Sequence, residues 1–150
     1  MKELNWGIMS TASIARKHII PALSKVENNN IKAIASRSYE KASNMADNFN
    51  IERVYDDYED LINDKDLDII YIPLPNTLHK KWVLKTLEKK KHILCEKPLG
   101  INAAEVREMI QKADQENCIL IEGFMYRYQP FIKKLKEIIE KEIGELRFLD

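Results

Sequence analysis

Short apolar runs alternate with longer segments of mixed polarity along most of the chain. Six runs are predicted to be strands, because each is bounded by polar or turn-forming residues: 4–9, 31–35, 54–55, 69–72, 93–95 and 119–121. The segments between them carry apolar residues at helical spacing and are predicted to be helices: 14–26, 40–49, 57–62, 78–90 and 103–116. This alternation favours the α/β class, with a doubly wound parallel sheet and helices on both of its faces.

Individual residues refine four of these helices. Pro21 falls inside the first helix and predicts a kink or break near Ile20, because proline removes a backbone hydrogen bond and clashes with the preceding turn. Asp57 and Asn102 are predicted to cap the helices that follow them. Helix 78–90 is expected to have a buried face and a solvated lysine face, formed by Trp82, Val83 and Leu87 and by Lys80, Lys81, Lys85, Lys89 and Lys90.

The composition excludes several classes of protein. The 150 residues are 45% hydrophobic, which is enough for one buried core, and 24 basic residues balance 24 acidic ones. This zero formal charge gives no overall field toward nucleic acid or an anionic membrane, so neither partner is expected. The short apolar runs and the lack of a signal peptide predict a cytoplasmic protein. Cys95 and Cys118 are placed in buried strands without metal-type spacing, so neither a disulfide nor a metal site is expected.

The turn after the first strand has the spacing of a dinucleotide-binding turn. The three positions that glycine usually occupies hold Ser10, Ala12 and Ala15. These residues are small enough to allow the tight turn, the close approach of the backbone to a pyrophosphate and the close packing of helix on strand. The start of the following helix offers free amides and a positive dipole end to a phosphate group. We therefore predict cofactor contacts from Ser10, Thr11, Ala12 and Ile14. The alternative is that these small residues only pack a strand against a helix.

The end of the second strand points to the identity of the cofactor. Ser36, Arg37 and Ser38 stand where an acidic residue would bind the adenosine ribose of NAD. A guanidinium with hydroxyl neighbours instead suits the 2′-phosphate of NADP, and Lys41 adds a second positive charge one helical turn later. The missing acid also counts against an S-adenosylmethionine enzyme. NADP is therefore favoured over NAD, with an ordinary surface arginine as the alternative.

The fifth strand leads into Glu96, Lys97 and Pro98. Proline cannot donate to a strand ladder, so pairing is expected to stop near Lys97 and to leave both charged side chains at the carboxyl edge of the sheet. Ligands bind at that edge in open α/β sheets. The alternative is a surface salt bridge between neighbouring residues at a strand end.

Together, these segments resemble the glucose-fructose oxidoreductase/inositol dehydrogenase/rhizopine catabolism family. The resemblance covers the whole chain and is carried, in order, by residues 7–15 (GIMSTASIA), 71–79 (YIPLPNTLH) and 95–99 (CEKPL). Residues 122–130 (EGFMYRYQP) are similar to the dihydrodiol dehydrogenase and NADP-dependent xylose dehydrogenase branch. The family has a Rossmann-type cofactor domain, so the same fold is expected here.

The resemblance implies a role for each matching residue. Lys97 matches the catalytic lysine near the nicotinamide, and Glu96 matches the acid that contacts the nicotinamide ribose. An ammonium beside a developing alkoxide stabilises negative charge and can donate a proton, which agrees with that role. Leu74, Pro75, Asn76 and His79 match a loop that lies along the cofactor. Arg127 matches an arginine that faces the cofactor or the substrate in the related branch.

Several of these assignments have alternatives. His79 can cap or pack near the start of its helix, and Tyr126 and Tyr128 can be core residues under a second domain. Met125 stands where some relatives carry tryptophan, a departure that bears on the substrate.

The resemblance also implies a domain organisation. Residues 1–122 are expected to form the cofactor domain, and 123–150 a connecting segment, a helix over about 131–142 and the first strand of a truncated α+β domain for substrate binding and dimerisation. The expected activity is hydride transfer between NADP and a hydroxyl or carbonyl carbon of a sugar, polyol or diol, in a homo-oligomer. The 150-residue chain alone is expected to turn over poorly. The alternatives are a non-catalytic dinucleotide-binding regulatory module and an assembly partner that binds nothing.

Overall fold

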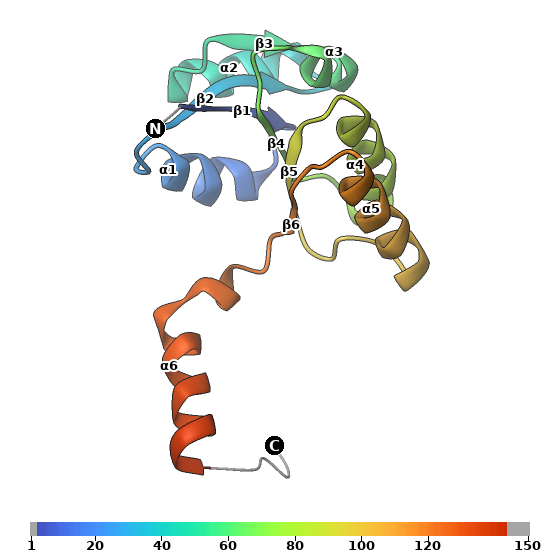
Figure 1. Ribbon diagram of the computed structural model, residues 1–150. Coiled ribbons are helices and arrows are strands. Elements are labelled where there is room, and N and C mark those ends of the chain that lie inside the picture. The colour runs from blue at the N-terminus through green and yellow to red at the C-terminus, as the bar shows by residue number, and fades with distance from the viewer. Residues whose placement is uncertain (1–2, 144–150) are drawn as a thin grey trace.

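A parallel sheet organises the computed structural model, which describes residues 3–143 (Figure 1). Its strands are β1 (Leu4–Met9), β2 (Asn29–Ala35), β3 (Arg53–Tyr55), β4 (Ile69–Ile72), β5 (His92–Cys95) and β6 (Leu120–Glu122). They lie in the order β3-β2-β1-β4-β5-β6, and every neighbouring pair is parallel. The predicted doubly wound sheet is therefore confirmed, with its topological switch point between β1 and β4, where ligands bind in such sheets.

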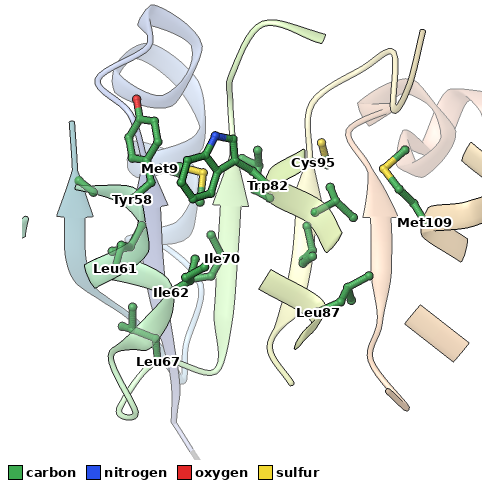
Figure 2. Packing of buried hydrophobic residues seen from close by; sticks show 14 of the residues in the cluster. Met9, Tyr58, Leu61, Ile62, Leu67, Ile70, Trp82, Leu87, Cys95 and Met109 are labelled. Atoms are coloured by element: carbon green, nitrogen blue, oxygen red, sulfur yellow. The ribbon is translucent and has the colours of Figure 1, made fainter. Parts of the chain in front are cut away.

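The helices cover the two faces of the sheet unequally. They are α1 (Ile20–Leu23), α2 (Tyr39–Phe49), α3 (Tyr58–Asn63), α4 (His79–Glu88), α5 (Ala103–Gln115) and α6 (Pro130–Ile138). Helices α3, α4 and α5 pack on one face, where they share a core with Met9, Ile70 and Cys95 (Figure 2). Helices α1 and α2 cover the other face beside β1 and β2. These two cores fix the strands whose carboxyl ends carry the candidate site.

The first helix differs from the prediction at the proline. A π-helical turn (Ala15–Ile19) leads directly into α1, and Pro21 stands in the first turn of α1. The helix therefore continues past Ile20 but changes type there, and Pro21 is tolerated because it stands in the first turn of α1. It also ends at Leu23, three residues earlier than predicted, and leaves Val26 exposed.

Two predicted caps are confirmed. Asp57 Oδ1 accepts a hydrogen bond from the backbone amide of Glu59 at 2.7 Å, and Asn102 Oδ1 accepts one from Glu105 at 3.0 Å. The apolar face of α4 is also confirmed, since Trp82, Val83 and Leu87 are buried. Its lysine face is less solvated than predicted.

Two lysines of that face are engaged. Lys80 pairs with Glu108 of α5 at 2.7 Å, and Lys85 pairs with Glu59 of α3. The predicted solvated face therefore helps to hold α4 between its two neighbouring helices.

The two cysteines have different surroundings. Cys95 is fully buried in β5, as predicted, whereas Cys118 is half-buried and precedes β6. The prediction of a strand position for Cys118 is wrong because pairing with β5 begins only at Leu120. Both thiols are free.

Among residues 3–143, no helix covers part of the sheet on the α1 side. An apolar hollow of about 460 Å³ lies there over β4, β5 and β6, lined by Trp6, Ile69, Leu94 and Ile121 among others. Helix α6 lies away from the sheet (Figure 1) and has no buried residue. The strand predicted after Gly144 lies outside the described residues. Within residues 3–143 no helix is long and apolar enough to cross a membrane.

Candidate functional site

The turn after β1 is held by the hydroxyl of Ser10. Ser10 adopts a positive φ of 103°, a backbone conformation that glycine takes more easily, and its side chain is largely buried. Its hydroxyl donates to the Pro73 carbonyl oxygen at 3.2 Å and accepts from the Ala12 amide at 3.3 Å. The hydroxyl thereby ties the turn after β1 to the segment after β4, across the switch point of the sheet.

The end of β2 supplies the positive charges. Ser38 caps α2 by accepting from the Lys41 amide at 3.4 Å, and Ser36 is buried and accepts from the Ser38 amide at 3.3 Å. The side chains of Arg37 and Lys41 are exposed beside this helix start. Two cations therefore stand at the positive end of a helix dipole, an arrangement that attracts anions.

These two segments meet around one hollow of about 410 Å³, here called the cationic hollow. It is lined by Ser10, Thr11, Ala12, Ser36, Arg37, Ser38, Lys41 and Tyr58. All but Tyr58 were predicted as cofactor contacts from the sequence, and the fold brings them together although they come from two separate turns. Ile14, also predicted, does not line the hollow and is half-buried. The cations, hydroxyls and helix amides of this hollow fit phosphate groups of a dinucleotide.

A second hollow of about 520 Å³, here called the aromatic hollow, adjoins the first. Arg37 and Tyr58 line both, and the second also takes in Asp56, Leu74, Pro75 and Trp82. Leu74 and Pro75 were predicted as cofactor contacts, whereas Asp56, Tyr58 and Trp82 were not. The cap at Asp57 was the available signal, because it places Tyr58 in the first turn of a helix at the carboxyl edge of the sheet.

The predicted cofactor loop after β4 divides into exposed and buried parts. Pro75 and Asn76 are exposed, whereas His79 has only 1% of its surface accessible. The His79 ring nitrogens lie 2.9 Å from the Pro98 carbonyl oxygen and 2.8 Å from that of Leu74. This geometry supports the packing alternative for His79, whose ring joins the loops after β4 and β5.

Glu96 and Lys97 lie at the carboxyl edge of the sheet, but they do not form the salt bridge that was the alternative reading. Glu96 Oε1 accepts a hydrogen bond from the hydroxyl of the fully buried Tyr71 at 2.7 Å. Burial, together with the negative charge of Glu96, raises the pKa of the Tyr71 phenol, which keeps it a neutral donor. Lys97 is exposed, and no other residue in the described range pairs with its ammonium group. A cation fixed only at its backbone is therefore free to meet a ligand.

The end of β6 contacts the loop after β5, and the segment that follows it lies outside both hollows. Glu122 Oε1 accepts from the Leu99 amide at 2.8 Å, which fixes the loop after Lys97. Arg127 is exposed in a 3₁₀ turn (Met125–Tyr128) and lines neither hollow. Tyr126 and Tyr128 are more than half exposed, so they are not core residues among the described part of the chain.

Sequence comparison shows several relatives of this chain. Trans-1,2-dihydrobenzene-1,2-diol dehydrogenase of Xenopus tropicalis is 40% identical over 147 residues, which are 96% of this chain and 44% of that protein. D-xylose 1-dehydrogenase (NADP(+)) 2 of Haloferax volcanii is 40% identical over 139 residues, which are 93% of this chain and 42% of that protein. The chain thus spans less than half the length of these relatives. Both belong to the branch that the 122–130 segment resembles.

Solved structures show the same relationship. KijD10, a 3-ketoreductase from Actinomadura kijaniata in complex with TDP-benzene and NADP, superposes with a TM-score of 0.91 at 30% identity over 97% of this chain and 46% of its own. A scyllo-inositol dehydrogenase from Lactobacillus casei, at 22% identity and a TM-score of 0.85, shares the fold. Residues 4–124 match the model of an oxidoreductase family with an NAD-binding Rossmann fold. The chain therefore belongs to that family, the glucose-fructose oxidoreductase/inositol dehydrogenase/rhizopine catabolism family.

Proposed function

We propose that this chain is the cofactor-binding part of an NADP-dependent oxidoreductase. The protein transfers hydride between nicotinamide and a hydroxyl or carbonyl carbon of a sugar, polyol or diol. The observation that carries this proposal is the cationic hollow, where Arg37 and Lys41 stand beside two serines at the start of α2 and no acidic side chain lines the wall. These residues are compatible with the 2′-phosphate of NADP. The wall has no carboxylate that could accept hydrogen bonds from the two free ribose hydroxyls of NAD.

The relatives support the cofactor and the substrate class. One relative carries NADP in its name and acts on D-xylose, another acts on a dihydrodiol, and a structural neighbour was crystallised with NADP. Hydroxyl-bearing carbons are the common feature of the first two substrates. We therefore propose a small molecule with such a carbon as the substrate.

Lys97 is the proposed catalytic residue. Bound NADPH supplies a hydride to a carbonyl carbon, and in the reverse direction NADP accepts one from a carbinol. During reduction the Lys97 ammonium stabilises the negative charge that develops on the carbonyl oxygen and donates a proton to it. During oxidation the neutral amine takes that proton from the hydroxyl. The exposure of Lys97 and its lack of a competing partner among residues 3–143 support this role.

Glu96 is proposed to contact the nicotinamide ribose. Its carboxylate is oriented by the Tyr71 hydroxyl, which donates to Oε1, and by the Lys97 backbone amide, which donates to Oε2 at 3.4 Å. Each carboxylate oxygen can accept a further hydrogen bond. A carboxylate accepts hydrogen bonds from sugar hydroxyls, which fits a ribose beside Lys97.

A direct titration tests the cofactor proposal. The chain is titrated with NADPH and separately with NADH, and nicotinamide fluorescence reports binding. We expect NADPH to bind at least about tenfold more tightly, because a charge-assisted phosphate contact contributes about 1.5 kcal/mol or more. Equal affinity for both, or none for either, would contradict the proposal. The chain alone is expected to show little turnover on sugars or diols, and appreciable turnover would contradict the proposed division of the protein.

We also propose that residues 1–122 form the cofactor domain and that 123–150 begin a second domain. Helix α6 supports this division, because Phe131 and Leu135 project from a helix that buries nothing in the described chain. An apolar helix face without a partner is expected to pack against further structure.

The protein is further proposed to form homo-oligomers. Support comes from the apolar hollow over β4, β5 and β6, where Ile121 is 39% exposed. Ile121→Lys is expected to shift the chain toward monomer in light scattering, whereas Ile110→Lys on α5, an exposed apolar position outside this hollow, is not. A monomeric unsubstituted chain at every concentration would contradict this.

A further inference from the structure

Tyr58 stands between the two hollows of the site. It is the first residue of α3, only 8% of its surface is accessible, and it lines both the cationic and the aromatic hollow together with Arg37. Figure 2 shows its ring beside Trp82, with the hydroxyl directed toward the carboxyl ends of the strands. The ring is therefore part of the core, while its polar end reaches the site.

The aromatic neighbours of Tyr58 fix the direction of that ring. Its ring and that of Trp82 pack edge to face, with centroids 5.1 Å apart and planes at 89°. Trp82 is held in turn by the ammonium groups of Lys81 and Lys85, at 5.1 Å and 5.4 Å from its ring centroid. The cap at Asp57 fixes the backbone just before Tyr58. The phenol oxygen thus has little freedom to move.

The Arg37 guanidinium and the Tyr58 phenol share both hollows, because both side chains line each of them. Burial raises the pKa of Tyr58, and the positive charge of the Arg37 guanidinium acts in the opposite direction. A buried phenol normally has a hydrogen-bond partner, and the exposed guanidinium of Arg37 is the charged donor that lines both hollows with it. Arginine carries a large rotamer entropy, which an untethered Arg37 would lose when it binds a ligand.

We propose that Tyr58 is a positioning residue for cofactor selection. Its phenol holds the Arg37 guanidinium between the two hollows, where the guanidinium meets the 2′-phosphate of NADP. This inference rests on the proposed function, and it adds that selection between NADP and NAD depends on a core tyrosine as well as on the arginine itself. Because part of the ordering of Arg37 would already be present without ligand, the Arg37 side chain would lose less entropy when the cofactor binds.

Tyr58→Phe tests this inference. The variant keeps the ring and its contact with Trp82 and removes only the hydroxyl. Binding is measured with NADPH and NADH, and also by competition with 2′,5′-ADP and 5′-ADP, which differ only in the 2′-phosphate. We expect affinity for NADPH and 2′,5′-ADP to fall about fivefold, as for the loss of a hydrogen bond to a charged group near solvent, with NADH and 5′-ADP nearly unchanged.

Two further variants separate positioning from a general structural role. Tyr55→Phe is the matched control, because the Tyr55 hydroxyl donates to Asp64 at 3.0 Å and not to Arg37. It is expected to leave the NADPH to NADH affinity ratio unchanged. In the Arg37→Ala background, Tyr58→Phe is expected to have no further effect on NADPH, because the group it positions is gone.

The outcomes distinguish this inference from the proposed function. If the unsubstituted chain prefers NADPH but Tyr58→Phe leaves the affinity ratio unchanged, or weakens all four ligands equally, the inference is overturned and the proposed function stands. If the unsubstituted chain does not prefer NADPH, both are overturned. Should Tyr58→Phe fail to fold, as thermal unfolding would show, Trp82→Phe is measured instead and is expected to lower the ratio through a less rigid Tyr58 ring.

Discussion

Arg37→Asp is expected to weaken NADPH binding about 100-fold, because it removes a charge-assisted hydrogen bond to phosphate and adds a repelling carboxylate. NADH binding is expected to change less than about threefold, or to improve, since a carboxylate at this place can accept from the free ribose hydroxyls. The two titrations, followed by nicotinamide fluorescence, measure the change in preference directly. The substituted chain should therefore prefer NADH.

Charge alone does not account for the expected effect. Arg107→Asp is the matched control, because Arg107 is exposed on α5 and lines neither hollow. It alters net charge by the same amount, so a similar loss of NADPH binding in that variant would attribute the effect to the overall field. Arg37→Lys keeps the charge but not the paired hydrogen bonds, and an intermediate loss is expected. Unchanged NADPH binding in Arg37→Asp would remove Arg37 from the site.

The residues of the cationic hollow could be predicted from the sequence because parallel strands end at a common edge. Ser10 follows β1 and Ser36 follows β2, and these strands are neighbours in the sheet. Once strand and helix alternation had indicated a parallel sheet, the two turns were bound to meet. The same reasoning places Glu96 and Lys97 at this edge, since β5 lies next to β4 in the sheet.

Contacts that depend on packing could not be predicted in this way. Tyr58 and Trp82 come from different helices, and only the side-by-side packing of α3 and α4 on one face brings their rings together. The direction of His79 likewise depends on the loop after β5, whose carbonyl group at Pro98 it meets. Spacing along the chain shows which residues share a helix face, but not which partner that face will contact.

Tyr71 has one property that the sequence predicts, its burial, and one contact that only the structure shows. Its place in a fully apolar run predicted a buried strand residue, and it is buried. That its hydroxyl would reach Glu96 followed only from the register, in which Tyr71 pairs with Leu94, two residues before Glu96. Glu96 belongs to the sequence motif at residues 95–99, and the Tyr71 hydroxyl on the neighbouring strand β4 orients its carboxylate.

Lys97→Ala is expected to lower kcat by about 10² to 10⁴, because it removes a proton donor and a positive charge at the reacting oxygen. The protein to be tested carries this chain and extends to the full length of the relatives. NADPH affinity is expected to change less than about threefold, because the proposed phosphate contacts lie in the cationic hollow at the ends of β1 and β2. Steady-state turnover on sugar and diol substrates, with the NADPH titration in parallel, measures both quantities.

This variant also separates an enzyme from a regulatory module, since both would bind NADPH through the same cationic hollow. In a regulatory module Lys97 has no reaction to serve, so its replacement would change no rate. Lys89→Ala provides the control, because Lys89 is exposed after α4 at the opposite edge of the sheet and should affect neither quantity. Turnover that survives Lys97→Ala at the unsubstituted rate would assign proton transfer to another residue. Selective loss of turnover, with binding intact, is the result that only a catalytic lysine explains.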